Sequence, residues 1–461
     1  MDINFLEDVI NKSLETGANF SEIFYEDKYT NNYLFLSGKI DKNTPNFTKG
    51  IGLRISKDSK VVYGSTNKLD DESINNLIIE LSSVYNDNRI IDYVNLVEEK
   101  IDNKYRPVID LKDFDINKKK ELFKRIDDYA RSKDKNVSQV QIKLFEENQD
   151  VIIANSTGKY IKDNRVRIRL DLFIFVSIDG KMEASYSRFA TMGGYEFLDK
   201  INFEEEIDKL IKEANDKIIA VPCPGGEMPV VIAAGFGGVI FHEACVHSLE
   251  AATTSKNSGP FANKLGEKVA SEKVTLIDDG TLDNEWGSVN IDDEGNKTQK
   301  NILIENGILK SYLIDELNSK IMNMNITGSG RRENYTYAPT ARMNNTYLQI
   351  GTDTKEDMIK SIKYGLYAHK MGGGSVNQNT SDFNFAVTSA YMIRNGKIAE
   401  SVSDVCLIGN GSEIIKNVEM VGSDLLHDPG YCGADSGYVP VNVGQPTIKV
   451  SKILVGGKDD K

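Results

Sequence analysis

The sequence predicts an α+β fold of two domains, an N-terminal α+β domain followed by a domain rich in antiparallel sheet that carries a His-Glu motif on a helix. Residues 165–175 alternate between charged and apolar side chains, which is the pattern of a strand. Apolar residues recur every three or four positions in residues 3–14, as they do on an amphipathic helix. Asn306-Gly307 and Asn395-Gly396 each lie between apolar runs and are two-residue hairpin turns. These three patterns together favour mixed helix and antiparallel sheet.

The N-terminal domain is expected to span residues 1–220. Its opening helix ends before Gly17, a residue suited to a helix cap. The remaining periodic segments predict strands at 21–25, 33–36, 50–55 and 61–65 and helices at 71–84 and 116–131. In the strand at 165–175, Arg165, Arg167 and Arg169 share one face, which we interpret as the solvent-exposed face.

The C-terminal domain is expected to span residues 221–461, because the proline- and glycine-rich stretch 221–226 ends the preceding helix. Residues 228–232 are apolar and predict a buried strand, and residues 235–238 form a glycine-rich turn. The apolar segment after the turn predicts a helix from Val239 to Leu249. That helix carries His242, Glu243 and His247, which makes it the first place to look for chemistry.

The spacing of the two histidines restricts how they can bind one metal. They are five residues apart, so a regular helix separates the two side chains by about 140° around its axis. Both can reach one metal only if the helix widens locally, as at a π-bulge, or ends near His247. The other interpretation is that both are histidines satisfied within the protein core.

A metal also needs a third protein ligand, for which the sequence offers several candidates. Cys432 is the best placed, because it lies in the glycine-flanked segment 429–433, which we expect to be a loop that presents a thiolate. Two imidazoles, one thiolate and an open fourth position are typical of catalytic zinc. The alternatives are Cys245, Cys223, Cys406, His369, His427, Glu250 and Asp435.

These motifs resemble the TldD/PmbA metalloproteases, also called modulators of DNA gyrase, and in particular the TldD branch that keeps the metal motif. The resemblance extends over nearly the whole chain, and its motifs are residues 241–251, 266–271, 277–281, 290–295, 337–340, 371–374 and 442–447. It implies that His242, His247 and Cys432 bind one Zn²⁺ per chain and that Glu243 is the catalytic glutamate. The family usually has glycine before the second histidine, whereas this chain has Val246, a β-branched residue that hinders local widening of a helix.

The function that follows is hydrolysis of short or unfolded peptides by a metal-activated water, with Glu243 as the general base. We expect an extended peptide to add to an exposed strand edge or glycine loop such as Gly373. Arg331, Tyr337 and His369 are further candidates for substrate binding. Oxyanion donors could come from the same three residues or from Tyr335, Arg332 and Arg342.

The resemblance also implies a dimer, either of this chain with itself or with a family member that lacks the motif. Because such members exist, the alternative function is a non-catalytic peptide-binding or chaperone-like subunit. Replacement of Glu243 by glutamine separates the two possibilities, since it removes the base and leaves the ligands in place.

Composition narrows the remaining classes of function. With 69 acidic and 56 basic residues and a net charge of −13, the surface should repel nucleic acid. The N-terminus lacks the pattern of a secretory signal, and the longest apolar stretch, residues 228–241, is too short to span a bilayer. Four scattered cysteines fit a reducing compartment. We therefore expect a cytoplasmic protein that binds neither nucleic acid nor membrane.

Overall fold

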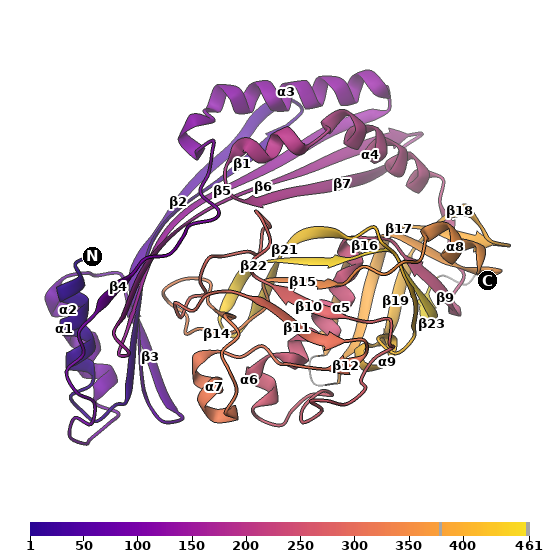
Figure 1. Ribbon diagram of the computed structural model, residues 1–461. Coiled ribbons are helices and arrows are strands. Elements are labelled where there is room, and N and C mark those ends of the chain that lie inside the picture. Colours follow the sequence, from indigo (N-terminus) through magenta and orange to yellow (C-terminus); the bar gives the residue numbers. More distant parts are fainter. Residues whose placement is uncertain (378–379, 458–461) are drawn as a thin grey trace.

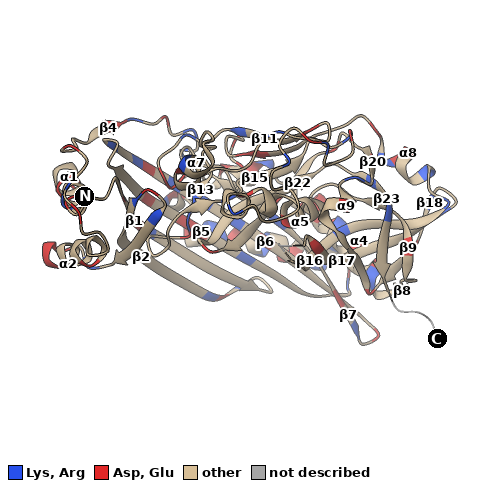
Figure 2. Cartoon of the chain, turned by 90° about the horizontal axis from the view of Figure 1, so that it is seen from below, with Lys and Arg blue, Asp and Glu red and all other residues tan. Residues whose placement is uncertain are grey.

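The computed structural model describes residues 1–377 and 380–457. Long N-terminal strands curve over the rest of the chain, and the C-terminal half lies against their concave side (Figure 1). Acidic and basic residues are interspersed along both parts (Figure 2). Within the described residues, no helix combines the length and the apolar character needed to cross a membrane.

The N-terminal half forms one sheet of seven strands in the order β3-β2-β1-β5-β6-β4, with β7 also paired to β6. All pairings are antiparallel except that of β4 with β6. The strands are β1 (Phe20–Leu36), β2 (Lys39–Lys57), β3 (Lys60–Thr66), β4 (Val97–Glu99), β5 (Val137–Asn155), β6 (Lys159–Ile178) and β7 (Lys181–Met192).

The strands predicted at 21–25 and 33–36 are in fact one strand, β1, of 17 residues. The polar residues between them resemble a loop in the sequence, yet their backbone pairs with β2 on one side and with β5 on the other. Glu26 in this stretch is buried and forms an ion pair with Lys28 at 2.8 Å. The sheet therefore extends through a segment whose composition alone does not favour a strand.

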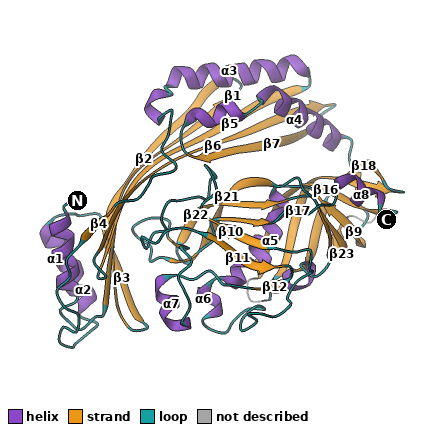
Figure 3. Ribbon diagram, in the orientation of Figure 1, coloured by secondary structure: helices purple, strands orange, loops and turns teal. Residues whose placement is uncertain are grey.

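Two pairs of helices cover the two ends of this sheet (Figure 3). Leucine, isoleucine and valine side chains of α1 (Ile3–Ser13) and α2 (Asp71–Ser82) form one core with β1 and β2. The same kinds of side chain from α3 (Ile116–Lys133) and α4 (Phe203–Ile218) form another with β5 and β6. Asp2, Asp70 and Asp115 accept backbone hydrogen bonds at the N-termini of α1, α2 and α3. The predicted helices at 3–14, 71–84 and 116–131 are confirmed with small changes at their ends.

Strand β6 confirms the alternation predicted for residues 165–175, but the prediction of a solvent-exposed charged face is wrong. Arg165 and Arg167 are 4% and 2% exposed. Arg165 contacts Asp293 at 2.6 Å and donates to the carbonyl of Ile291, both from the C-terminal half. Alternation identifies two faces of a strand, whereas it does not say which distant segment covers each of them.

The described residues of the C-terminal half form two larger sheets and one small pair. The six-stranded sheet has the order β12-β11-β10-β15-β22-β21 and comprises β10 (Leu276–Asp279), β11 (Lys300–Glu305), β12 (Ile308–Leu309), β15 (Asn345–Leu348), β21 (Leu426–Ala434) and β22 (Gly437–Gln445). The small pair is β13 (Gly330–Arg331) with β14 (Thr340–Ala341). Most pairings in this half are antiparallel, as predicted, but β15–β22 is parallel, as are the pairings of residues 366–368 with 230–232 and of residues 402–403 with 221–222.

The eight-stranded sheet has the order β16-β9-β23-β19-β17-β18-β8, with β20 paired to β23. Its strands are β8 (Val221–Pro222), β9 (Gly226–Ile232), β16 (Tyr364–Asn377), β17 (Asp382–Arg394), β18 (Lys397–Ser403), β19 (Val405–Asn410), β20 (Val418–Val421) and β23 (Ile448–Gly456). The helices of this half are α5 (Val239–Ala244), α6 (Ala251–Thr254), α7 (Glu316–Met322), α8 (Lys355–Lys360) and α9 (Gly411–Ile414).

Both predicted hairpins are confirmed. Asn306-Gly307 joins β11 to β12, and Asn395-Gly396 joins β17 to β18. All four turn residues have positive φ, between 48° and 82°, which asparagine and glycine tolerate best. The first sheet uses residues up to 192 and the sheets of the C-terminal half begin at 221. The assignment of 1–220 and 221–461 as separate domains stays a prediction.

Candidate metal centre and cleft

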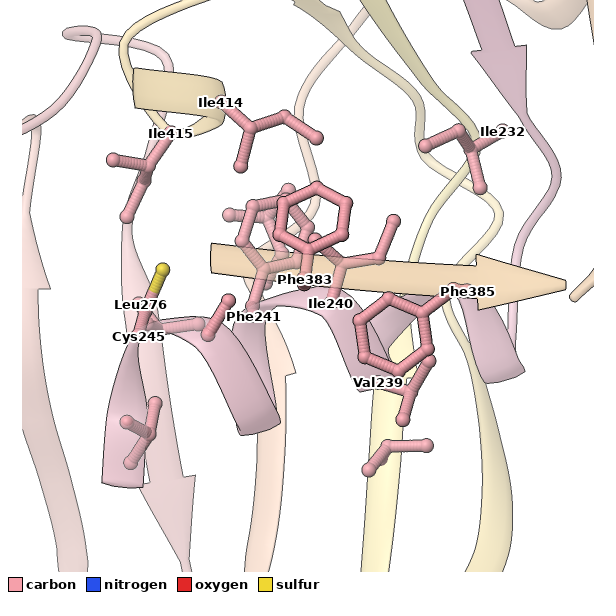
Figure 4. Close-up of a cluster of buried hydrophobic side chains, with 14 of the residues drawn as sticks. Ile232, Val239, Ile240, Phe241, Cys245, Leu276, Phe383, Phe385, Ile414 and Ile415 are labelled. Carbon is pink, nitrogen blue, oxygen red and sulfur yellow. The ribbon is translucent and has the colours of Figure 1, made fainter. Parts of the chain in front are cut away.

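Helix α5 lies in the core between the two large C-terminal sheets. Figure 4 shows Val239, Ile240 and Phe241 of this helix packed among Leu276 of β10 and Phe383 and Phe385 of β17. All of these side chains are at least 90% buried. The packing fixes how deep the helix sits and therefore where His242 and Glu243 point.

Glycines allow the chain to pass close to neighbouring backbone at the start of this helix. Gly235 has φ = 100°, a conformation that L side chains rarely adopt. A Cβ on Gly238 would lie 2.6 Å from the backbone of Gly444, so a larger residue would push α5 away from β22. The predicted strand at 228–232 and the glycine turn are both confirmed, as β9 and the short 3₁₀ turn Phe236–Gly238.

The predicted continuous helix from Val239 to Leu249 is wrong, because α5 ends at Ala244. Cys245 has φ = −121° and ψ = −58°, and the chain continues in a 3₁₀ turn, Val246–Leu249, that carries His247. A Cβ on Gly411 of α9 would lie 2.2 Å from the carbonyl oxygen of Ala244, which shows how closely α9 packs at the break. The helix thus ends before His247, which was one of the two geometries that the five-residue spacing allowed.

The break brings the two imidazoles together. The rings of His242 and His247 lie 5.2 Å apart between centroids, at an angle of 88°. One ligand atom from each of His242, His247 and Cys432 lies within 4.8 Å of the other two, and all three residues are buried. The Sγ of Cys432 is 3.2 Å from Nε2 of His247, although the two residues are 185 positions apart.

Cys432 reaches the histidines from strand β21, in register with Val439 of β22. The expectation that it lies in a loop is therefore wrong. Among the alternative third ligands, Cys245 instead contacts the carbonyl oxygen of Gly411 through its sulfur, and His427 pairs with Glu285 at 3.1 Å. Glu250 contacts His247 from the side of the ring that faces away from Cys432.

The three donors suit a metal ion in both chemistry and spacing. Sulfur and nitrogen ligands of a tetrahedral zinc are separated by roughly 3.5 Å, given the usual bond lengths. The observed separation of 3.2 Å between Sγ and Nε2 is close to that value. Burial raises the pKa of Cys432, but the charges of His247 and His242 outweigh burial and hold this pKa well below its ordinary value. The thiolate, which is the form that binds metals, is therefore favoured.

The same neighbours change the charge of His247. Burial lowers the pKa of His247, but the carboxylate of Glu250 and the sulfur of Cys432 raise it well above its ordinary value. The negative groups around His247 therefore favour a positive charge at this position. A bound metal ion would supply such a charge.

Glu243 is the member of the motif that faces open space. Its side chain is 29% exposed, whereas that of His247 is 2% exposed, and its Oε2 lies 3.5 Å from Nε2 of His247. Together with His242 it lines a cavity of about 410 Å³. The other lining residues include Arg169, Arg188, Phe236, Val239, Gly373, Gly374, Ser375, Phe385 and Tyr431.

The four residues predicted to bind substrate lie in different places. Gly373 lines the cavity beside Glu243. Arg331 lines a separate cavity and donates to the carbonyl of Met343 at 2.6 Å. Tyr337 and His369 lie outside the lining of the cavity that contains Glu243. Their roles stay predictions, and Gly373 is the one that the geometry brings next to the motif.

The lining residues that the sequence did not indicate include Arg169, Arg188 and Tyr431. Arg169 appeared to belong to an exposed strand face, and Arg188 carries no motif. Tyr431 could have been suspected because it precedes Cys432. Its ring stacks edge-on against Trp286 and lies 5.8 Å from the guanidinium of Arg169. The cleft is thus walled partly by β6 and β7 of the N-terminal sheet.

Comparison with known proteins gives a consistent result over the whole chain. PmbA/TldA metallopeptidase domain 1 matches residues 21–83, the central domain matches residues 109–220 and the C-terminal domain matches residues 225–457. A protein named metalloprotease TldD homolog from Buchnera aphidicola of Schizaphis graminum is 33% identical over 98% of this chain and 95% of its own.

A more distant relative, named zinc metalloprotease TldD homolog, comes from Saccharolobus solfataricus. It is 26% identical over 97% of this chain and 99% of its own. Among solved structures, a Thermotoga maritima protein titled a modulator of a DNA gyrase superposes with a TM-score of 0.80. The match covers 98% of this chain and 99% of that chain at 20% identity, so it concerns the fold alone.

Proposed function

Since this chain belongs to the PmbA/TldA metallopeptidase family, we propose that it is a zinc-dependent peptidase that hydrolyses short or unfolded peptides. One observation carries the proposal. The ligand atoms of His242, His247 and Cys432 converge within 4.8 Å, and Glu243 beside them opens onto a cavity of about 410 Å³. Ligands, a base and space for a substrate therefore occur at one place.

The donor set supports one zinc ion per chain, held by His242, His247 and Cys432. Two imidazoles and a thiolate suit zinc, and three protein ligands leave a position for water or substrate. The name of the Saccharolobus solfataricus relative also supports zinc. When bound, zinc supplies a Lewis acid that polarises the scissile carbonyl group and acidifies a water molecule.

Glu243 acts as the general base and then as the general acid. Its carboxylate takes a proton from the attacking water as the oxygen bonds to the carbonyl carbon, and it delivers this proton to the amine nitrogen as the C–N bond breaks. A partly exposed carboxylate 3.5 Å from Nε2 of His247 can contact a water in the cavity without leaving the ligand cluster. Proton transfer of this kind requires a separation of about 3 Å from the reacting atom.

An extended peptide would bind along β16. Strand β9 pairs with β16 only through Leu366–Ala368, so the strand has no β9 partner beyond that point. Gly373, Gly374 and Ser375 are exposed there and line the cavity. A peptide that adds as a strand must expose its own backbone, which favours short or unfolded substrates over folded proteins.

Substitution of Gly373 tests this placement of the substrate. A Cβ at Gly373 would meet nothing within 4 Å, so the fold should accept a side chain there. We expect Gly373→Ala to be nearly silent and Gly373→Leu to raise KM for an unfolded polypeptide about tenfold, because the larger side chain fills the cleft. Steady-state kinetics together with melting temperatures check the graded effect, and tenfold corresponds to about 1.4 kcal/mol of binding.

The matched control is Gly180→Leu, at a hairpin turn where a Cβ would also meet nothing within 4 Å. Gly180 has φ = 81°, so this control should lower stability slightly and leave KM unchanged. If Gly373→Leu hydrolyses the polypeptide with the KM of the wild type, the peptide does not pass this strand.

We also propose that the chain forms a dimer, either with itself or with a motif-lacking relative. Light scattering measures the molar mass of the purified protein and so tests whether the chain pairs with itself.

A further inference from the structure

Glu250 contacts the face of the metal centre that the cleft does not reach. Its Oε2 lies 3.1 Å from Nδ1 of His247, and its side chain is 8% exposed. The other ring nitrogen, Nε2, faces Cys432. Since the carboxylate accepts a hydrogen bond from the protonated Nδ1, Nε2 is the nitrogen that is left free to bind a metal. It also fixes the rotation of the ring.

Arg342 contacts the hairpin that carries Cys432, the third ligand of the centre. Its guanidinium is fully buried, and Nη2 donates to the carbonyl oxygen of Cys432 at 2.6 Å. Nη1 donates to Oγ of Ser436 and to the carbonyl oxygen of Gly437, both at 2.9 Å. These acceptors belong to the hairpin of β21 and β22 that carries Cys432. The planar fork thus holds the position of the backbone from which the thiolate projects.

Glu250 and Arg342 also contact each other. Nε of Arg342 lies 3.8 Å from Oε1 of Glu250, an ion pair between two buried groups. A continuous chain of contacts therefore runs from His247 through Glu250 and Arg342 to Cys432. It closes on itself, because Cys432 Sγ lies against Nε2 of His247. The ring of contacts joins residues that are far apart in the sequence.

We propose that Glu250 and Arg342 are positioning residues that align His247 with Cys432 before a metal binds. Glu250 orients the imidazole, Arg342 fixes the hairpin of the thiolate, and the ion pair between them sets the distance from one ligand to the other. This inference rests on the metal centre of the proposed function, though not on peptide hydrolysis. Groups of this kind, which contact ligands and not the metal, commonly change metal affinity by 10- to 100-fold when they are removed.

A purely structural role would predict something different. Buried ion pairs elsewhere in the chain stabilise the fold without contact with the ligands. Arg54 and Glu22 are such a pair, at 2.6 Å and with side chains 5% and 1% exposed. Loss of either pair should lower the melting temperature, because a buried charge then loses one of its partners. Only the loss of Glu250 or Arg342 should change how the metal is held.

The test compares Glu250→Gln, Glu250→Ala and Arg342→Lys with the matched controls Glu22→Gln and Arg54→Lys. Zinc dissociation constants are measured by competition with a chromophoric chelator, and the cobalt-loaded proteins are measured by absorption spectroscopy. We expect zinc affinity to fall about 10- to 100-fold in the Glu250 and Arg342 variants. We also expect their thiolate-to-cobalt absorption band to shift. Both controls should keep the zinc affinity and the cobalt absorption band of the wild type, even if their melting temperatures are lower.

The inference is overturned if Glu250→Gln, which preserves shape, and Arg342→Lys both bind zinc as the wild type does. It is also overturned if the controls lose affinity equally, since the effect would then be general destabilisation. A wild-type chain that binds neither zinc nor cobalt would remove the centre and this inference with it. A chain that binds zinc through these residues but hydrolyses no peptide would overturn the proposed function and leave this inference standing.

Discussion

Replacement of Glu243 by glutamine is expected to lower kcat/KM for peptide hydrolysis by about 10²- to 10⁴-fold, the usual contribution of a general base. Glutamine has the same size and can still accept a hydrogen bond, whereas it cannot take a proton from water. The side chain is 29% exposed in the cavity, so the exchange should not disturb the packing of α5. Steady-state kinetics with an unfolded polypeptide measure the loss.

Zinc binding and peptide binding distinguish the loss of the general base from a general disruption of the site. Glu243→Gln should bind zinc and peptide as the wild type does, because the ligands His242, His247 and Cys432 are unchanged. Glu227→Gln, at an exposed residue paired with Lys452, is the control and should hydrolyse normally. Hydrolysis by Glu243→Gln at the rate of the wild type would reject this residue as the base. If the wild type binds peptide and never cleaves it, the chain is a binding subunit.

Removal of the metal is expected to lower the melting temperature substantially. The centre joins the 3₁₀ turn after α5 to strand β21, two segments that are 185 residues apart at His247 and Cys432. A ligand that binds only the folded state stabilises it by about 4 kcal/mol when its free concentration is a thousand times its dissociation constant. A bound metal would link the buried His247 and Cys432, which otherwise contact each other directly at 3.2 Å.

Calorimetry with and without a chelator measures this effect, and two cysteine variants serve as controls. Cys432→Ser should melt near the temperature of the chelated wild type and should not respond to zinc. Cys406→Ser changes a partly exposed cysteine of β19 that is not part of the ligand cluster, so it should respond as the wild type does. Equal melting temperatures for the wild type with and without chelator would contradict a shared metal centre.

Helices and hairpin turns that depend on interactions between neighbouring residues were predicted correctly from the sequence. Helices α1, α2 and α3 begin after Asp2, Asp70 and Asp115, and these residues cap them in the structure. The hairpins at Asn306 and Asn395 require two consecutive residues with positive φ, which Asn-Gly supplies. Such features depend on neighbours along the chain, so a single sequence contains enough information to find them.

Features that depend on distant neighbours were missed. Strand β1 continues through polar residues because β2 and β5 bond to both of its edges. Arg165 is buried because Asp293 and the backbone of Ile291 cover it. The alternation of the sequence around Arg165 is the same whether a segment lies over that face or water does. Long-range pairing therefore decided the elements for which local patterns were ambiguous.

The candidate site was predictable in its residues but not in its geometry. Two histidines five residues apart allowed either a widened helix or a helix that ends early. The chain ends the helix at Ala244, so Val246 lies in a 3₁₀ turn and no widening is required at this residue. Glu250 was named only as an alternative metal ligand and Arg342 only as a candidate oxyanion donor. Their contacts with His247 and with the hairpin of Cys432 could not be predicted, because nothing local indicates that positions 250, 342 and 432 meet.

The metal centre is tested most directly by elemental analysis of the purified wild type and of the His247→Ala and Cys432→Ser variants. We expect about one zinc per chain in the wild type and loss of that zinc in both variants, because the two residues contribute to one centre from distant segments. A wild type that holds no metal even after reconstitution with zinc, or a Cys432→Ser variant that keeps its zinc, would rule out this centre.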